Sequence, residues 1–197
     1  MSDNPLGELV SGWGPPERPG TTELSGRFVH LSPLSAQQHA ADLYKAFQGK
    51  DAVWDYMHVG PFHSSAQFYK WVSDITANDD FVFFAIRDLA TSQLGGVASY
   101  LRIAPDKGSI EVGNIALAPH FQKTTAATEA MYLMMKWAFE AGYRRYEWKC
   151  NALNRPSRRA AQSFGLSFED VFRQALVVKG ATEIRLGLLQ LIGIGQL

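Results

Sequence analysis

The sequence predicts one α+β domain with a central mixed sheet, mostly antiparallel and flanked by helices. Its 197 residues fit a single domain of ordinary size. Three strand-like segments follow one another at 81–87, 94–103 and 109–118, and sequential strands of this kind favour antiparallel pairing. A long helical segment then precedes a strand at 144–150, which favours one parallel crossover. With the strands at its two ends, the sheet should have about six to seven strands.

The N-terminal half begins with an extended arm. Residues 1–25 are rich in Gly, Pro and Glu without periodicity, and we expect them to pack on the body through Leu9, Val10 and Trp13. Alternation over 27–31 predicts the first strand. Two helices should follow, because serines precede segments with apolar residues at helical spacing. These are residues 35–47 after Ser35 and residues 65–75 after Ser64 or Ser65.

The C-terminal half alternates helices with strands. The long helix should run from Thr124 to about Ala141, with Gly142 as its C-terminal cap. A second helix should begin after Asn154 and end at Gly165. Residues 171–179 are predicted to form another strand.

Composition and charge exclude several classes of protein. Hydrophobic residues make up 46%, which excludes a disordered chain. Lys plus Arg and Asp plus Glu both number 19, so the neutral chain lacks the basic excess of a nucleic-acid binder. The longest apolar run, 186–194, is far short of the roughly 20 residues that span a bilayer. The single cysteine permits no intrachain disulfide and suits the cytoplasm, and the five histidines show no metal-ligand spacing.

One segment has the features of an anion site. A predicted strand ends at Ala118, the loop 119–123 follows, and a helix begins at about Thr124. Free backbone N–H groups and the positive end of the helix dipole would face a ligand there, and a pyrophosphate is the natural guest. Lys123 adds a positive charge. An ordinary capped helix has the same pattern, and without further support that is the preferred explanation.

Two motifs stand out, at residues 122–130 and at residues 146–157. Together they resemble the GNAT superfamily of acetyl-CoA-dependent N-acetyltransferases, and most closely its RimJ/RimL-type branch. Residues 122–130 read Gln-Lys-Thr-Thr-Ala-Ala-Thr-Glu-Ala. They match the pyrophosphate loop Gln/Arg-x-x-Gly-x-Gly/Ala, followed by Thr-Glu-Ala, except that Thr125 replaces the glycine. Residues 146–157 resemble the strand and the Asn-x-x-Ser helix start of that branch. The resemblance covers about residues 27–180 and implies a GNAT-like sheet splayed between its fourth and fifth strands.

The resemblance also implies where acetyl-CoA binds. Its pantetheine should lie in the gap like an extra strand, against the backbone of Ile115, Ala116 and Leu117. Asn154 should contact the same arm or simply cap its helix. The pyrophosphate should meet the loop and first helical turn, at Gln122, Lys123, Thr124, Thr125, Ala126, Ala127 and Thr128. The threonine at 125 narrows the loop but brings a hydroxyl that could bind a phosphate oxygen.

The implied reaction is direct transfer, in which an amine attacks the thioester carbonyl. The site must accept a proton from the ammonium, stabilise the oxyanion and protonate the leaving thiolate. Ser157 matches the serine that protonates the thiolate, although serine at this position usually caps a helix. Glu169 matches a glutamate proposed in that branch as a base that acts through water. The alternative is that it is an ordinary solvated surface residue. Glu111 is the alternative base or else a cross-strand ion pair. His58 is a third choice.

The aromatic segment 54–62 should shape the acceptor pocket through Trp54, Tyr56 and His58, unless its aromatics belong to the core. The acceptor is expected to be a protein N-terminus or a small amine, and the chain a monomer or homodimer. Cys150 is not expected to act as a nucleophile, because no histidine is near it in sequence. The alternatives are a non-catalytic acyl-CoA-binding protein and a plain interaction domain.

Residues 181–197 depart from the family pattern, which has a polar stretch followed by an aromatic strand. Shifted by one base, codons permitted for residues 180–193 can encode Arg-Asn-Arg-Asp-Thr-Ala-Trp-Phe-Ala-Ala-Ile-Asp-Trp. This matches the expected tail in the expected place. The hypothesis is therefore an arm at 1–25, an acetyltransferase domain at 26–180 and a frameshifted reading of the last 17 residues.

Overall fold

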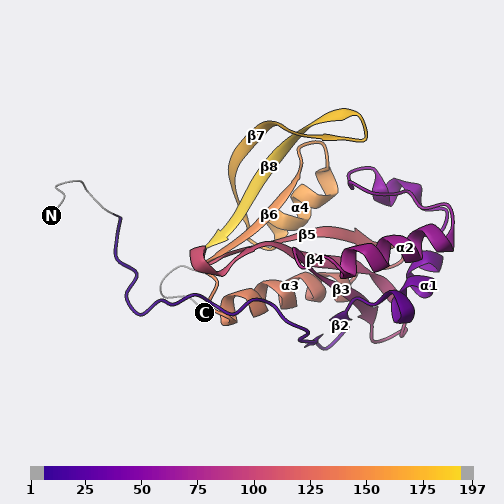
Figure 1. The fold of residues 1–197 in the computed structure, drawn as a ribbon, viewed down its shortest axis with the longest axis horizontal. Helices are drawn as coiled ribbons and strands as arrows, with labels where there is room; N and C mark the ends of the chain where they lie inside the picture. The colour runs from indigo at the N-terminus through magenta and orange to yellow at the C-terminus, as the bar shows by residue number, and fades with distance from the viewer. Residues whose placement is uncertain (1–6, 192–197) are drawn as a thin grey trace.

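A mixed sheet of eight strands forms the centre of the molecule, which a computed structural model describes over residues 7–191 (Figure 1). The strands are β1 (Leu24–Ser25), β2 (Val29–Pro33), β3 (Phe81–Asp88), β4 (Leu94–Ala104), β5 (Ser109–Leu117), β6 (Arg145–Asn151), β7 (Ser167–Val178) and β8 (Ala181–Leu191). Their order is β1-β2-β3-β4-β5-β6-β8-β7. Only β5 and β6 run parallel among the paired strands of the described chain. The predicted antiparallel meander and single crossover are confirmed.

Helices cover both faces of this sheet (Figure 1). They are α1 (Ala36–Phe47), α2 (Ser65–Thr76), α3 (Thr125–Glu140) and α4 (Arg155–Ser163), with short 3-10 turns η1 (Asp51–Trp54) and η2 (Pro105–Lys107). The side chains of Ser35, Ser64 and Asn154 each accept a backbone N–H in the first turn of their helix, as expected for N-caps. No helix within residues 7–191 is both long and apolar enough to cross a membrane.

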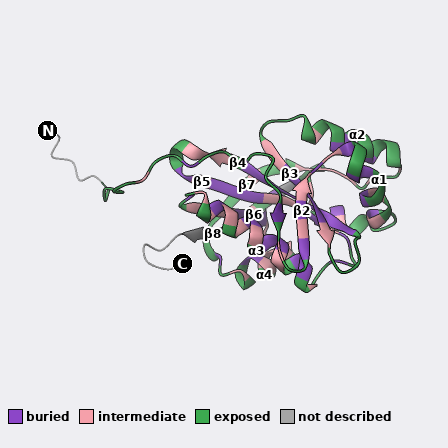
Figure 2. Cartoon of the chain, turned by 90° about the horizontal axis from the view of Figure 1, so that it is seen from below, coloured by how far each residue is buried: buried purple, intermediate pink, exposed green. Residues whose placement is uncertain are grey.

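Two hydrophobic cores lie on opposite faces of the sheet. Along β3, Phe83 and Ala85 pack towards α1 and α2, whereas Phe84 and Ile86 pack towards α3. This alternation follows from the two-residue period of a strand. Figure 2 shows the burial concentrated in the sheet, with the outer faces of the helices exposed. Strands β3, β4 and β5 therefore contribute to both cores.

The parallel pair β5–β6 is joined along only part of its length. Its register runs from Ser109 opposite Arg145 to Val112 opposite Trp148, and stops there. Gly113–Leu117 have no partner on β6 among the described residues, so the two strands form a fork. A bulge coincides with it: Asn114 has φ +50°, and the β4–β5 register shifts between Val97 and Ser99. The predicted splay is confirmed.

The two ends of the chain differ in part from what the sequence predicted. In the arm, Trp13 lies against Gly108 as expected, but Leu9 and Val10 are exposed, so the prediction that they pack on the body is wrong. The sheet has eight strands, whereas about six to seven were predicted, because β1 and β8 are also part of it. Residues 181–191 form β8, which inserts between β6 and β7, so most of the atypical tail belongs to the sheet. The remaining tail, 192–197, lies outside the described residues.

Candidate functional site

The fork places two helix N-termini near one gap in the sheet. On one side, β5 leads through the loop after Leu117 into α3. On the other side, β6 leads through residues 152–154 into α4. The backbone of Ile115, Ala116 and Leu117, where the resemblance implies that pantetheine binds, borders the gap, and Ala116 and Leu117 pair with β4 on their other edge. The unpaired edge can accept an extended ligand as though it were a strand.

The loop before α3 presents free hydrogen-bond donors. Thr124 is the N-cap: its hydroxyl accepts from the Ala127 N–H at 3.1 Å and donates to the Phe121 carbonyl. Lys123 has φ +62°, which turns the chain sharply into the helix. Within residues 7–191, the backbone N–H groups of Lys123, Thr125 and Ala126 meet no acceptor. Three unpaired donors at the positive end of a 16-residue helix are the arrangement that anion-binding sites use, and the pyrophosphate site stays a prediction.

The other predicted side chains of this loop have distinct positions. Gln122 donates from Nε2 to the Leu117 carbonyl at 2.8 Å, which ties the loop to the end of β5. Thr125 is exposed, so its hydroxyl is free to meet a ligand. Ala126 and Ala127 are buried against the core, and the Thr128 hydroxyl donates to the Thr124 carbonyl. The loop therefore fits a pyrophosphate mainly through its backbone, Lys123 and Thr125.

The start of α4 brings together groups from the last paired part of β6. The Asn154 Oδ1 accepts from the Ser157 N–H at 3.1 Å, as a cap should. The Ser157 Oγ accepts from the Trp148 Nε1–H at 2.9 Å. Cys150 is buried on the same face of β6, and burial raises the pKa of its thiol. A thiol held neutral is a poor nucleophile, and the inactivity of Cys150 in the reaction stays a prediction.

The two candidate carboxylates belong to one chain of ion pairs on the opposite face of the sheet. We call it the charge ladder; it crosses β4, β5, β6 and β7 through Arg102, Glu111, Lys149, Glu147, Arg145 and Glu169. Glu111 is 2% exposed, and Arg102 holds both of its oxygens at 2.7 and 2.6 Å. Lys149 donates a further bond to it at 2.6 Å. Glu111 thus occupies the ion-pair role that the sequence left open.

Glu169 stands at the exposed end of the charge ladder. Arg145 donates to both of its oxygens, at 2.9 and 2.5 Å. The bonds from Arg145 hold the pKa of Glu169 below its usual value. For Glu147, burial favours the neutral form, but the bonds from Lys149 and Arg145 outweigh it and lower the pKa. Both carboxylates are therefore anionic at neutral pH, and the basic role of Glu169 stays a prediction.

The aromatic segment divides between core and surface. Trp54 is buried and packs edge-on against Phe47, Phe62 and Trp71. Tyr56 is exposed and donates from its hydroxyl to the Leu153 carbonyl, in the loop between β6 and α4. His58 Nε2 lies 2.9 Å from an Arg185 N–H, which only donates, so the imidazole nitrogen accepts. Burial and the Arg185 charge lower the pKa of His58. Tyr56 and His58 are thus the members placed beside the fork.

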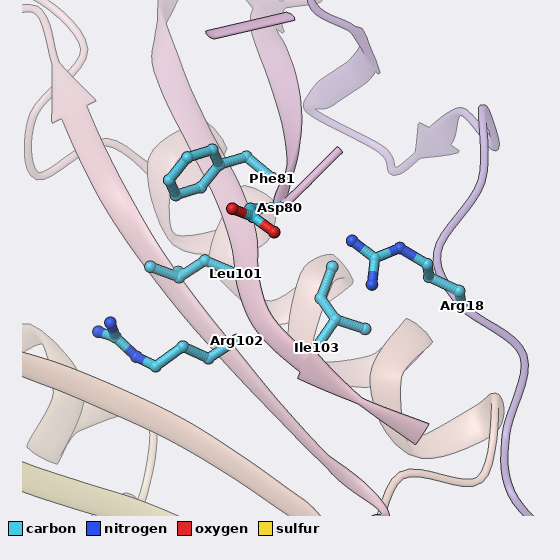
Figure 3. A pocket seen from close by; sticks show the side chains of 6 residues that line it. All are labelled: Arg18, Asp80, Phe81, Leu101, Arg102 and Ile103. Atoms are coloured by element: carbon cyan, nitrogen blue, oxygen red, sulfur yellow. The ribbon is translucent and has the colours of Figure 1, made fainter. Parts of the chain in front are cut away.

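A cavity of about 290 Å³ opens beside Arg102, the residue at the β4 end of the charge ladder (Figure 3). Figure 3 shows Arg18 entering from the N-terminal arm, Asp80 and Phe81 at the start of β3, and Leu101, Arg102 and Ile103 on β4. Leu101 links this cavity to the fork, because its side chain covers Gly113. Sequence patterns did not indicate it, since its lining comes from three segments far apart in the chain.

The sequence did not indicate several further residues of the site. Asn114 has a left-handed backbone at the bulge, and its side chain donates to Ser99 at 3.0 Å. Lys149 and Arg145 alternate along β6 with core residues, and only the strand register shows that they meet Glu111 and Glu169. No group of three potential metal ligands occurs among the described residues.

Comparisons with known proteins bear on these features. Residues 29–167 match the family model described as the acetyltransferase (GNAT) domain. A GCN5-related N-acetyltransferase from Brucella melitensis is 38% identical, with a TM-score of 0.90 over 92% of this chain and 84% of that one. A probable acetyltransferase of the GNAT family from Chromobacterium violaceum is 34% identical, with a TM-score of 0.90 over 97% and 96% of the two chains.

A more distant structure shares the fold. The RimL acetyltransferase of ribosomal protein L7/L12 is 18% identical, with a TM-score of 0.75 over 90% of this chain and 99% of that one. At this identity the likeness concerns the fold alone and does not assign the RimJ/RimL branch. None of the curated proteins compared with the chain matches it.

Proposed function

Since the chain belongs to the GNAT acetyltransferase family, we propose that it is an N-acetyltransferase of the RimJ/RimL type. It transfers the acetyl group of acetyl-CoA directly to a primary amine, on a protein N-terminus or a small molecule. One observation supports this most: the forked strands β5 and β6 adjoin a loop with three unpaired backbone donors. The fork suits an extended pantetheine, and the loop suits its pyrophosphate.

Acetyl-CoA supplies an activated thioester, and the chain's residues supply position and proton transfer. Lys123, Thr125 and the amides of the α3 N-terminus bind the phosphates. The backbone N–H groups along Ile115–Leu117 are the candidates that stabilise the oxyanion. Ser157, in the first turn of α4, protonates the leaving thiolate. Glu169 accepts the amine proton through water; its pair with Arg145 lowers its pKa and makes it a weak base, so water carries the proton between the fork and this carboxylate.

The Thr125→Glu variant tests the binding step. Its carboxylate would face the pyrophosphate and repel it, so CoA should no longer raise the melting temperature. For wild-type protein, CoA at about 100 times its Kd should stabilise the fold by roughly 2.7 kcal/mol. Thr22→Glu, on the exposed arm, is a control of equal charge change. An unchanged shift in Thr125→Glu would mean that the phosphates bind elsewhere.

The threonine in place of the loop glycine also supports the second candidate, a non-catalytic acyl-CoA-binding protein. Release of free thiol from acetyl-CoA with a panel of amines separates the two. Ser157→Ala should lower turnover more than acetyl-CoA binding, because a proton donor to the thiolate acts mainly in the transition state. A protein that binds CoA but releases no thiol with any amine would support the binding role.

A further inference from the structure

The indole of Trp148 makes a hydrogen bond that ordinary core packing does not require. Its Nε1–H donates to Ser157 Oγ at 2.9 Å, and the side chain is only 5% exposed. The ring also stacks on Phe164, near the end of α4, with centroids 6.4 Å apart. Trp148 thus contacts α4 at both ends, and its polar atom meets the residue proposed to protonate the thiolate.

The position of Trp148 is fixed by the sheet. It lies opposite Val112 in the last paired register of β5 and β6, immediately before the fork. Ser157 is held from a second direction, because Asn154 Oδ1 accepts its backbone N–H at 3.1 Å. Two separate partners therefore restrain Ser157. Asn154 holds its backbone N–H, and Trp148 holds its side-chain oxygen.

The chemistry of the two groups sets the direction of the serine proton. An indole N–H can only donate, so it occupies a lone pair of Ser157 Oγ and leaves the hydroxyl proton free to point elsewhere. The hydroxyl proton is therefore not used by Trp148 and stays available for donation to a bound ligand.

We propose that Trp148 is the positioning residue for Ser157: its N–H orients the hydroxyl proton towards the leaving sulfur and stabilises the charge that develops on Oγ. This inference rests on the proposed acetyl transfer. As the carbon–sulfur bond breaks, its electron pair goes to sulfur and the Ser157 proton follows, giving the thiol. The attacking ammonium loses two protons in the transfer: one passes through water to Glu169, and water returns the other to Oγ. A donor preset before reaction needs no reorganisation when the charge appears.

A double-mutant cycle with Trp148→Phe and Ser157→Ala separates positioning from packing. Trp148→Phe keeps an aromatic ring but removes the donor, so kcat should fall on the order of 10-fold with little change in KM for acetyl-CoA. In the Ser157→Ala background, the same change should have no further effect on kcat. Trp137→Phe, which alters a tryptophan of α3 packed on Tyr100, should leave kcat near the wild-type value. An equal loss from Trp148→Phe in both backgrounds would overturn the proposal.

Indole NMR gives a readout that needs no turnover. The chain has five tryptophans, so ¹⁵N-labelled protein should give five indole resonances, and Trp148→Phe identifies the one of interest. That resonance should move upfield in Ser157→Ala, and CoA should shift it in the wild type but not in Ser157→Ala. If the wild type acetylates no amine, the proposed function fails, yet these shifts still test the orientation. A Trp148 resonance that neither Ser157→Ala nor CoA moves would overturn the inference.

Discussion

Glu111→Gln should lower the free energy of unfolding by about 3 kcal/mol, because it leaves two cations without their shared carboxylate. Glu111 is 2% exposed, and three charge-assisted bonds from Arg102 and Lys149 satisfy it. Removal of one partner of a buried ion pair costs about 3–5 kcal/mol. The low end applies here, since the Arg102 side chain is half exposed and can be hydrated. Lys149 also keeps its pair with Glu147.

Urea unfolding followed by tryptophan fluorescence measures this loss, with Glu169→Gln as the matched control. Glu169 lies at the solvent end of the same charge ladder, where an ion pair contributes at most about 1 kcal/mol. In thermal unfolding, the loss in Glu111→Gln corresponds to a fall in Tm of roughly 6–12 °C. Equal stability of the two variants would refute the view that Glu111 is a buried structural anion.

Two further predictions concern titration and tertiary contacts. Burial lowers the pKa of His58 in the folded state, so the unfolded chain binds the proton first and stability should fall as pH drops below about 6.5. In melting experiments at several pH values, His58→Asn should make this loss of stability at low pH smaller. Part of the loss should remain, because burial also lowers the pKa of His39. The same dependence of Tm on pH in both proteins would contradict the argument. Glu129→Gln should destabilise the fold by about 2 kcal/mol, because its carboxylate accepts the backbone N–H groups of Arg27, Phe28 and Val29. Urea unfolding with no loss would show that these bonds are replaced by water.

The sequence could predict local features because their causes are local. The caps at Ser35, Ser64 and Asn154 lie where the hydroxyl and amide side chains precede apolar periodicity. The fork followed from the resemblance, and the register confirms it. Contacts between strands could not be predicted in the same way. Glu111 meets Arg102 and Lys149 only because β4, β5 and β6 align at one register, which periodicity does not fix.

The atypical tail leads to the last prediction, that a one-base change near the Gly180 codon restores the family pattern. β8 lies between β6 and β7, so both of its backbone edges are paired, and Gly187 and Leu188 are buried. In the shifted reading frame, the first tryptophan of the expected tail is encoded by bases from the codons of Leu186 and Gly187. A Cβ at Gly187 would lie 2.9 Å from a ring carbon of Phe172, a side chain that is 40% exposed and has room to move outwards.

A buried aromatic at this place should stabilise the sheet, since full burial of a large apolar side chain contributes about 1.5–3 kcal/mol. We therefore expect the restored chain to unfold at a higher temperature than the present one. DNA sequencing across residues 178–183 and thermal unfolding of both chains check the two parts of the prediction. The hypothesis is wrong if no single-base change gives the expected tail. Equal melting temperatures would show that the present β8 completes the sheet as well as the restored strand does.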